Sequence, residues 1–395
     1  MFQVLLLSFL FLASGAHRLS LPQSFDTSNR YLFTLNADID ADGHVKLLQD
    51  LQSKAVVKRQ DGQAFEGVTH QYNLTNFQGY AEHFDSSVLQ WLKSHSGLET
   101  IEPDRIWRQS GIVEQKDAQP SLSLISHRID EGHDIYAYDS SAGAGTFGYV
   151  IDSGINVKHV EFEGRASLGY NAVKGAKFVD DTGHGTHMAG VMGSKTYGVA
   201  KKCKLIAVKA ASGETSSVSQ TLDAFTWAAK DIHKKKRQAK AVINISITGE
   251  YSKLFNDAVD AAFNAGITTV TCAGNFGSDA AKFSPASSKS AITVSSADMH
   301  YTRAKDANFG KHVDVFAPGV GIDGPWIGNQ VAIKRASGTS QASANVAGLA
   351  LYLKGLFNLP DAKTTAHKIY ELATPGVVKD PKDSKNLFAY NGSDK

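Results

Sequence analysis

The sequence has few cysteines, few prolines and no long apolar run, and each shortage excludes a class of protein. With 2 cysteines and 9 prolines in 395 residues, the chain is neither a small disulfide scaffold nor a proline-rich linker protein. No apolar stretch reaches the ~20 residues that a membrane helix needs, so we expect no membrane partner. The 41 basic and 39 acidic residues nearly cancel, which gives no electrostatic reason to expect nucleic acid as a partner.

The first residues have the pattern of a targeting segment. Val4–Leu12 is a short apolar stretch, and small residues follow it up to Ala16, which predicts a signal peptide over residues 1–16 and a secreted, extracellular protein. A buried hydrophobic strand or helix is the alternative interpretation, and the position beside the N-terminus favours the signal. We expect Cys203 and Cys272 at the ends of strands on opposite edges of a sheet, and therefore predict two free, buried thiols.

The next part of the chain has a mixed pattern of its own. Strands and helices alternate over about 80 residues, which predicts a small α+β domain of the split βαβ type. The expected strands are 31–35, 65–72 and 98–106, and the expected helices are 45–51 and 86–94. Residues 108–123 are polar and aperiodic, which predicts a linker or a cleavage region.

The rest of the chain alternates apolar strands with helices. This pattern predicts an α/β fold with a doubly wound, mostly parallel sheet that has helices on both faces. In such sheets, chemistry gathers at the carboxyl ends of the strands. The expected strands are 147–151, 205–208, 241–245, 268–270, 292–294 and 313–316, and the expected helices are 219–236, 257–265 and 340–357.

Two motifs in this region carry acid–base side chains. Asp152 directly follows the first expected strand, where a half-buried carboxylate can orient an imidazole; an aspartate that initiates a turn is the other interpretation. His184 lies between glycines, which allow close backbone packing at the start of a helix. A metal site formed with His187 is the rival, but no third ligand is suitably spaced, and we interpret His187 as a core histidine.

Two further motifs carry candidates for acyl transfer. Ser340 begins an Ala/Leu-rich helix, where a backbone N–H can stabilise an oxyanion; a plain N-cap serine is the alternative. Asn275 follows a strand, and its amide is either a second oxyanion donor or part of a turn. The four residues occur in the order Asp, His, Asn, Ser with separations of 32, 91 and 65 residues. The combination favours the catalytic interpretation of all four.

The order Asp–His–Ser is that of the subtilisin triad, and the chain resembles the subtilisin-like serine proteases, in particular the secreted fungal proteinase K branch. The blocks YVIDSGI, EFEGR, YGVA and NLFAYN carry the resemblance, at 149–155, 161–165, 197–200 and 386–391. It covers roughly residues 125–391. A weaker match at 77–81, FQGYA, relates residues 31–107 to the family's inhibitory propeptide.

The resemblance implies a secreted serine endopeptidase that is made as a self-processed zymogen and needs no cofactor. It implies an inhibitory propeptide over residues 17–111, give or take about eight residues, and a peptidase domain over 112–395. Ser340 would be the nucleophile, His184 the general base and Asp152 the group that holds the imidazole tautomer, while Asn275 binds the oxyanion. The implied partners are protein and peptide substrates and the chain's own propeptide, and we expect a monomer. The implied substrate-binding residues are Thr215, Ser216, Ser246, Ile247 and Thr248.

The chain departs from the family pattern beside the nucleophile and in the substrate walls. Gln341 replaces the usual Met after the nucleophile, and Ala344 and Asn345 replace the usual Pro and His. None of these residues transfers a proton, so the departures leave the expected activity in place. Thr248 replaces a usual Gly in a substrate wall, so the family's substrate preference is not carried over.

Three smaller features have competing interpretations. Asp314 lies where the family offers a carboxylate to a calcium ion, with carbonyls near Lys289 and Ala291; an aspartate satisfied by backbone N–H groups is the favoured alternative. The basic run at 233–237 is interpreted as the solvated end of a helix and not as a nucleic-acid site. Glycosylation sequons stand at Asn73, Asn244 and Asn391; Asn391 is the preferred candidate, and Asn244 falls in a strand expected to be buried.

Two other functions fit parts of the sequence less well. A catalytically silent homologue that acts as a binding protein would lack a triad member, and none is missing. A secreted esterase or lipase would need a G-x-S-x-G nucleophile elbow, which the chain does not contain.

Overall fold

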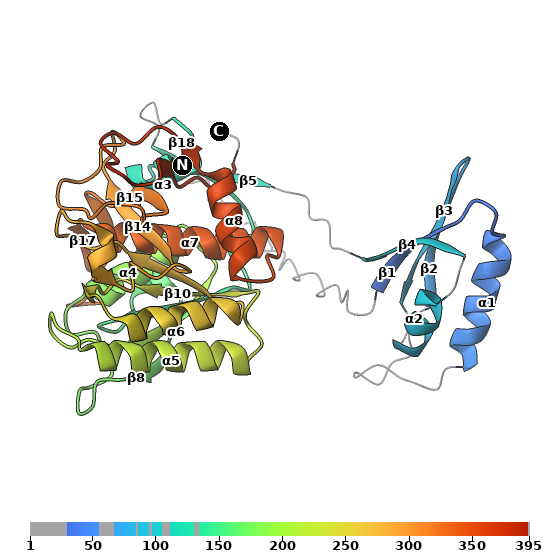
Figure 1. The fold of residues 1–395 in the computed structure, drawn as a ribbon, viewed down its shortest axis with the longest axis horizontal. Helices are drawn as coiled ribbons and strands as arrows, with labels where there is room; N and C mark the ends of the chain where they lie inside the picture. Colours follow the sequence, from blue (N-terminus) through green and yellow to red (C-terminus); the bar gives the residue numbers. More distant parts are fainter. Residues whose placement is uncertain are drawn as a thin grey trace, which may run out of the picture. The chain divides into compact units, whose positions relative to one another are not determined.

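The computed structural model describes residues 30–54, 67–83, 86–94, 97–104, 111–129 and 134–393. The chain forms two compact units, residues 1–109 and residues 110–395 (Figure 1). The expected signal peptide, residues 1–16, lies outside the described residues. No helix in the described part is long and apolar enough to span a bilayer.

The N-terminal unit is one antiparallel sheet with two helices. Its strands lie in the order β2-β3-β1-β4, which confirms the split βαβ pattern; β3 is an additional strand that the sequence reading did not include. The two helices bury Val45, Leu48, Val88, Leu89 and Leu92 at helical spacing against Phe33 and Tyr80 of the sheet. The elements are β1 (Arg30–Leu35), α1 (Ala41–Lys54), β2 (Gly67–Leu74), β3 (Phe77–His83), α2 (Ser86–Lys93) and β4 (Leu98–Pro103).

The C-terminal unit is built on a nine-stranded sheet in the order β18-β19-β15-β14-β12-β10-β7-β9-β8. Every neighbouring pair is parallel except β18 with β19, as expected for a doubly wound fold. The strands are β7 (Phe147–Asp152), β8 (Ala166–Asn171), β9 (Lys204–Lys209), β10 (Ala241–Ile245), β12 (Thr268–Cys272), β14 (Ile292–Ala297), β15 (Val315–Pro318), β18 (Thr374–Pro375) and β19 (Leu387–Phe388). Three short pairs lie outside this sheet: β5 (Ile112–Lys116) with β6 (Ile135–Asp139), β11 (Gly249–Glu250) with β13 (Phe283–Ser284), and β16 (Ile322–Pro325) with β17 (Ile333–Ala336).

Helices cover both faces of the large sheet, and each face has its own buried cluster (Figure 1). One cluster contains α4 (His184–Gly193) and α7 (Thr339–Phe357), and the other contains α5 (Val218–Lys234) and α6 (Lys253–Asn264). A Ser217–Gln220 capping box begins α5, because each side chain satisfies a backbone N–H of the first turn. The remaining helices are α3 (Pro120–Ser126), α8 (Ala362–Leu372) and two 3₁₀ turns, Val160–Phe162 and Ala280–Lys282.

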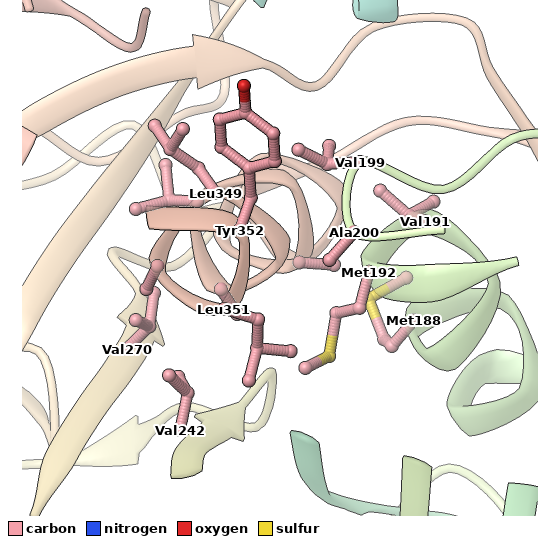
Figure 2. Close-up of a cluster of buried hydrophobic side chains, with 14 of the residues drawn as sticks. Met188, Val191, Met192, Val199, Ala200, Val242, Val270, Leu349, Leu351 and Tyr352 are labelled. Carbon is pink, nitrogen blue, oxygen red and sulfur yellow. The ribbon is translucent and has the colours of Figure 1, made fainter. Parts of the chain in front are cut away.

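The two helices that carry His184 and Ser340 pack directly against each other. Met188 and Met192 of α4 meet Leu351 of α7 in the buried cluster of Figure 2. Gly348 of α7 permits this approach, because a Cβ there would stand 2.6 Å from the carbonyl oxygen of Met192. The core therefore sets the spacing of the two catalytic candidates.

Over residues 111–123, the structure corrects the interpretation of residues 108–123 as an irregular linker; residues 108–110 lie outside the described residues. Residues 112–116 form β5, which pairs with β6 along five residues, and Pro120 begins α3. Leu122 and Ile125 of α3 are fully buried in the main core. The prediction failed because these elements are short and β5 is largely exposed, so neither shows a sustained period.

Both cysteines are free and buried, as predicted. The two cysteines do not lie at opposite edges of the sheet, contrary to the expectation from the sequence. Cys203 precedes β9 and Cys272 ends β12, and only β7 and β10 lie between these two strands in the sheet. The strands are parallel, so the two thiols are separated along the strands as well as across them.

Candidate active site

The candidate residues lie where four neighbouring parallel strands end. Strands β12, β10, β7 and β9 are adjacent, so the segments that follow them meet at one edge of the sheet. A cleft of 440 Å³ at this edge is lined by Asp152, His184 and all five expected substrate residues, together with Trp326 and Lys334. The five are Thr215, Ser216, Ser246, Ile247 and Thr248.

Asp152 and His184 form a close pair. The Nδ1 atom of His184 lies 2.8 Å from Oδ1 and 2.9 Å from Oδ2 of Asp152. Asp152 is 2% exposed, and its Oδ1 also accepts the Ser153 backbone N–H at 2.8 Å. This contact places the ring proton on Nδ1, which leaves Nε2 as a base.

Asp180 and Ser153 hold the start of α4, and the sequence reading missed both. One Asp180 oxygen accepts the Gly183 N–H at 2.9 Å, and the other accepts the Thr186 N–H at 2.8 Å. The Ser153 hydroxyl donates to Asp180 at 2.8 Å and accepts the Gly185 N–H at 3.0 Å. An acidic residue just before a Gly-rich helix start was the available signal.

Opposing influences set the pKa of His184. Burial lowers it, but the charge and hydrogen bond of Asp152 and the charge of Asp180 together raise the pKa above its usual value. The neutral imidazole, the form that accepts a proton, therefore predominates only above this raised pKa.

Ser340 lies in the first turn of α7, after Gly338 as the N-cap. Ser340 is 7% exposed, and its hydroxyl donates to the Ser246 carbonyl at 3.3 Å. Within the described residues it makes no hydrogen bond to His184. The two candidate residues are therefore not directly hydrogen-bonded, and contacts of this kind often tighten only when substrate binds.

Asn275 is fixed by the residue before the nucleophile. Its Oδ1 accepts the Thr339 N–H at 2.8 Å and the Thr339 hydroxyl at 2.9 Å. With Oδ1 engaged, Nδ2 is the group left to donate. The first N–H groups of α7 also lack intrahelical partners, so amide donors from two segments are available beside Ser340.

His187 has the structural role that the sequence predicts. The ring is fully buried, and its Nε2 lies 3.2 Å from the Ile322 carbonyl and 3.1 Å from that of Lys334. Burial lowers the pKa of His187 to about 4, which keeps the ring neutral. No group of three His, Cys, Asp or Glu side chains suited to a metal exists in the described ranges.

The residues around Asp314 do not fit a calcium ion. One carboxylate oxygen lies 2.7 Å from the ammonium of Lys385, and the other accepts the Thr293 N–H at 3.0 Å. Calcium takes about six to eight oxygen ligands, and here a lysine cation already occupies the one carboxylate. The interpretation of Asp314 as a strand-end aspartate is the one this geometry supports.

The structure overturns the preferred glycosylation site. Asn391 is fully buried, and its Nδ2 donates to the Ala137 carbonyl at 2.8 Å, because the C-terminal segment folds back onto the region of α3. Asn244 is also fully buried, as expected. Asn73 lies exposed on β2.

The basic run at 233–237 lies at the C-terminal end of α5. Lys235 pairs with Asp231 of the same helix at 2.9 Å. Arg237 lies over the Phe147 ring at 3.7 Å and donates to the Tyr149 hydroxyl at 3.0 Å. Part of the run is therefore packed against the sheet and not simply solvated.

Comparisons with known proteins agree with this geometry. Residues 143–387 match the Subtilase family, and residues 30–110 match Peptidase inhibitor I9. The chain is 45% identical over 369 residues to Alkaline protease 1 of Aspergillus flavus, covering 92% of this chain and 91% of that protein. It is 42% identical over 377 residues to Subtilisin-like proteinase Mp1 of Magnaporthiopsis poae, covering 92% of each.

The fold has a solved counterpart as well. The crystal structure of a cold adapted subtilisin-like serine proteinase superposes with a TM-score of 0.65 at 31% identity, covering 70% of this chain and 99% of that one. The chain therefore belongs to the subtilase family, as a serine endopeptidase with an I9 inhibitor domain ahead of its peptidase domain.

Proposed function

We propose that Asp152, His184 and Ser340 hydrolyse peptide bonds by acyl transfer. The observation that carries the assignment is the Asp152–His184 pair, with Nδ1 at 2.8 and 2.9 Å from the carboxylate oxygens, in a cleft bordered by Ser246. Ser340 touches the same Ser246 through two hydrogen bonds. The chemistry uses protein side chains and needs no cofactor.

Each step follows from these positions. Nε2 of His184 takes the Ser340 hydroxyl proton while Oγ bonds to the scissile carbonyl carbon, and the carbonyl oxygen becomes an oxyanion. Asn275 Nδ2 and the Ser340 N–H donate to that oxyanion. The same proton then passes from Nε2 to the leaving nitrogen as the C–N bond breaks. Water then bonds to the acyl carbon while Nε2 of His184 takes its proton. Nε2 returns that proton to Ser340 Oγ as the acyl–oxygen bond breaks, which releases the acid product and regenerates the serine.

The two cleft walls suit an extended peptide. Residues 213–216 form one side, in a turn closed by the bridge between Ser212 and Thr215, and residues 246–248 form the other. Both have backbone groups that can pair with a substrate strand. We propose that they bind the residues next to the scissile bond, which makes protein and peptide chains the substrates.

We further propose that the enzyme is secreted and removes its own N-terminal unit. Residues 112–116 pair with β6 inside the peptidase unit, so a cut before Ile112 spares the folded core. The I9 match ends at residue 110. Ser340 would perform this cut with the same machinery that later acts on other proteins.

The test compares two serines of one helix in the full-length chain. Ser340→Ala removes the nucleophile, and we expect an uncut, inactive precursor with an unchanged melting temperature. Ser343→Ala, one turn later, removes a buried hydroxyl that accepts from or donates to Ser246 at 3.0 Å, and should still be processed. Trimming of purified Ser340→Ala protein, in the absence of other proteases, would contradict the assignment.

A further inference from the structure

Gln341, the residue after the nucleophile, has a buried amide whose carbonyl oxygen finds no hydrogen-bond donor among the described residues. The side chain is 3% exposed, and its Oε1 makes no hydrogen bond within the described part of the chain. Buried polar groups are normally paired, so each exception asks for a physical reason. A ligand group that arrives only during the reaction is such a reason.

The position of the amide identifies which group that is. A Cβ built on Gly338 would stand 3.1 Å from Gln341 Oε1 and 3.2 Å from Asn275 Nδ2. The two amides therefore border the same point, the missing side chain of Gly338 at the start of α7. Gly338 has a φ of +151°, and its lack of a side chain leaves the space between the amides open.

We propose that Gln341 is a second side-chain donor to the oxyanion, beside Asn275. This inference rests on the proposed function. A half-turn about the last side-chain bond exchanges Oε1 and Nε2 at nearly constant shape, and in the described part of the chain no hydrogen bond holds Oε1 against that turn. Nε2 then donates one N–H to the negative oxygen as it forms. Because the charge exists only after Ser340 has attacked, the contact stabilises the transition state more than the bound substrate.

The residue type matters for this role. The family's usual Met at this position has a thioether, which is a weak acceptor and no donor. Asn275 is held from the other side, since Thr339 fixes its Oδ1, whereas Gln341 is not fixed. We therefore expect a smaller contribution from Gln341 than from Asn275.

The experiment measures kcat and KM of the mature enzyme on one peptide amide substrate. Gln341→Met removes the donor at similar volume, and we expect kcat to fall roughly tenfold with KM changed less than about twofold, against the hundredfold or more typical of a principal donor. Gln341→Glu keeps the shape but only accepts, and should lower kcat further. In the double variant Gln341→Met with Asn275→Ala, the fold-loss of kcat should be smaller than the product of the two single-variant losses, because both donors serve one oxygen.

Controls separate this inference from the proposed function. Active-site titration with a serine-reactive phosphonate gives the concentration of folded enzyme, so a folding defect does not count as lost kcat. Wild-type kcat in Gln341→Met, or in Gln341→Glu, overturns the donor role while leaving Ser340 as the nucleophile. If Ser340→Ala protein stays active, the proposed function itself fails.

Discussion

The buried carboxyl groups of the two units of the chain differ in their hydrogen bonding. In the peptidase unit, Asp180 is surrounded by donors from Ser153, Gly183 and Thr186, and Asp152 faces an imidazole. In the N-terminal unit, Glu82 is 1% exposed, and neither of its oxygens has a hydrogen-bond partner among the residues that the structure describes there. One unit uses buried charge to build a site, and the other carries a carboxyl group that its fold does not satisfy.

The difference has a pH consequence. Burial raises the pKa of Glu82 from 4.5 to about 9, so the folded unit keeps a proton that the unfolded chain gives up. The folded form is therefore favoured most below pH ~4.5 and loses stability as the pH rises toward about 9, by at most ~1.4 kcal/mol per pH unit. On the proposed mechanism, the peptidase unit should gain activity over part of the same range, because His184 must lose its proton to act as a base.

Other titratable groups surround Glu82 and belong to the same argument. Burial, and after it the negative charge of Glu82, raise the pKa of Tyr80, whose hydroxyl lies 3.1 Å from Nε2 of His44. His44 is 7% exposed. A test of Glu82 must therefore compare variants across pH and not at one pH alone.

The largest expected effect comes from removing the charge of Asp152, the carboxylate that contacts His184 in the peptidase unit. Asp152→Asn keeps the shape but removes the charge and favours the wrong tautomer of His184, and we expect kcat to fall about ten-thousandfold. Asp257, exposed and paired with Lys253 of the same helix at 2.6 Å, provides the control, and Asp257→Asn should stay within about twofold. Steady-state kinetics on the mature enzyme measure kcat of both variants. A fall in kcat of less than tenfold in Asp152→Asn would show that Asp152 does not position the base.

The second effect concerns stability of the peptidase unit. Asp180→Ala leaves several buried donors without an acceptor, which we expect to cost about 3 kcal/mol. Thermal unfolding of the Ser340→Ala precursor, with and without the Asp180 change, gives the difference. Asp257→Ala should cost under ~0.5 kcal/mol. Equal melting points for the two aspartate variants would show that Asp180 is dispensable for the start of α4.

The third effect comes from replacing Glu82, the buried carboxyl group of the N-terminal unit. The amide introduced by Glu82→Gln cannot ionise. At pH 8, β3 should therefore be more protected from hydrogen exchange in a Ser340→Ala precursor that carries Glu82→Gln than in the Ser340→Ala precursor alone. At pH 5 the two proteins should differ little. The Ser340→Ala precursor keeps the whole chain intact for this comparison, and Glu99→Gln on exposed β4 is the matched control. If the parent and Glu82→Gln show the same pH dependence, Glu82 is not the group that weakens the unit.

The sequence predicted the strand ends and the residues on them, because apolar strands, glycine-flanked motifs and their order are local signals. It did not predict Asp180 and Ser153 as supports of His184, because their donors and acceptors come from segments that only the fold brings together. The burial of Asn391 has no local signal either, because its N–H donates at 2.9 Å to the carbonyl of Ile125 in α3, a segment far away in the sequence.

The smallest effect is a shift in the pKa of His184, which should distinguish the adjacent residues Asp180 and Asp181. The acid limb of kcat/KM should lie above the usual histidine pKa, because Asp152 and Asp180 outweigh the lowering by burial. Asp180→Asn removes one of the two charges, so the pKa of His184 should fall and the limb should move to lower pH. Asp181, which pairs with Lys209 at 3.2 Å, is not among the causes of the shift, and Asp181→Asn should leave the limb in place. The pH dependence of kcat/KM, measured at constant ionic strength to hold screening fixed, checks both. A limb that moves equally in the two variants would mean that general loss of negative charge, and not the position of Asp180 beside α4, tunes the base.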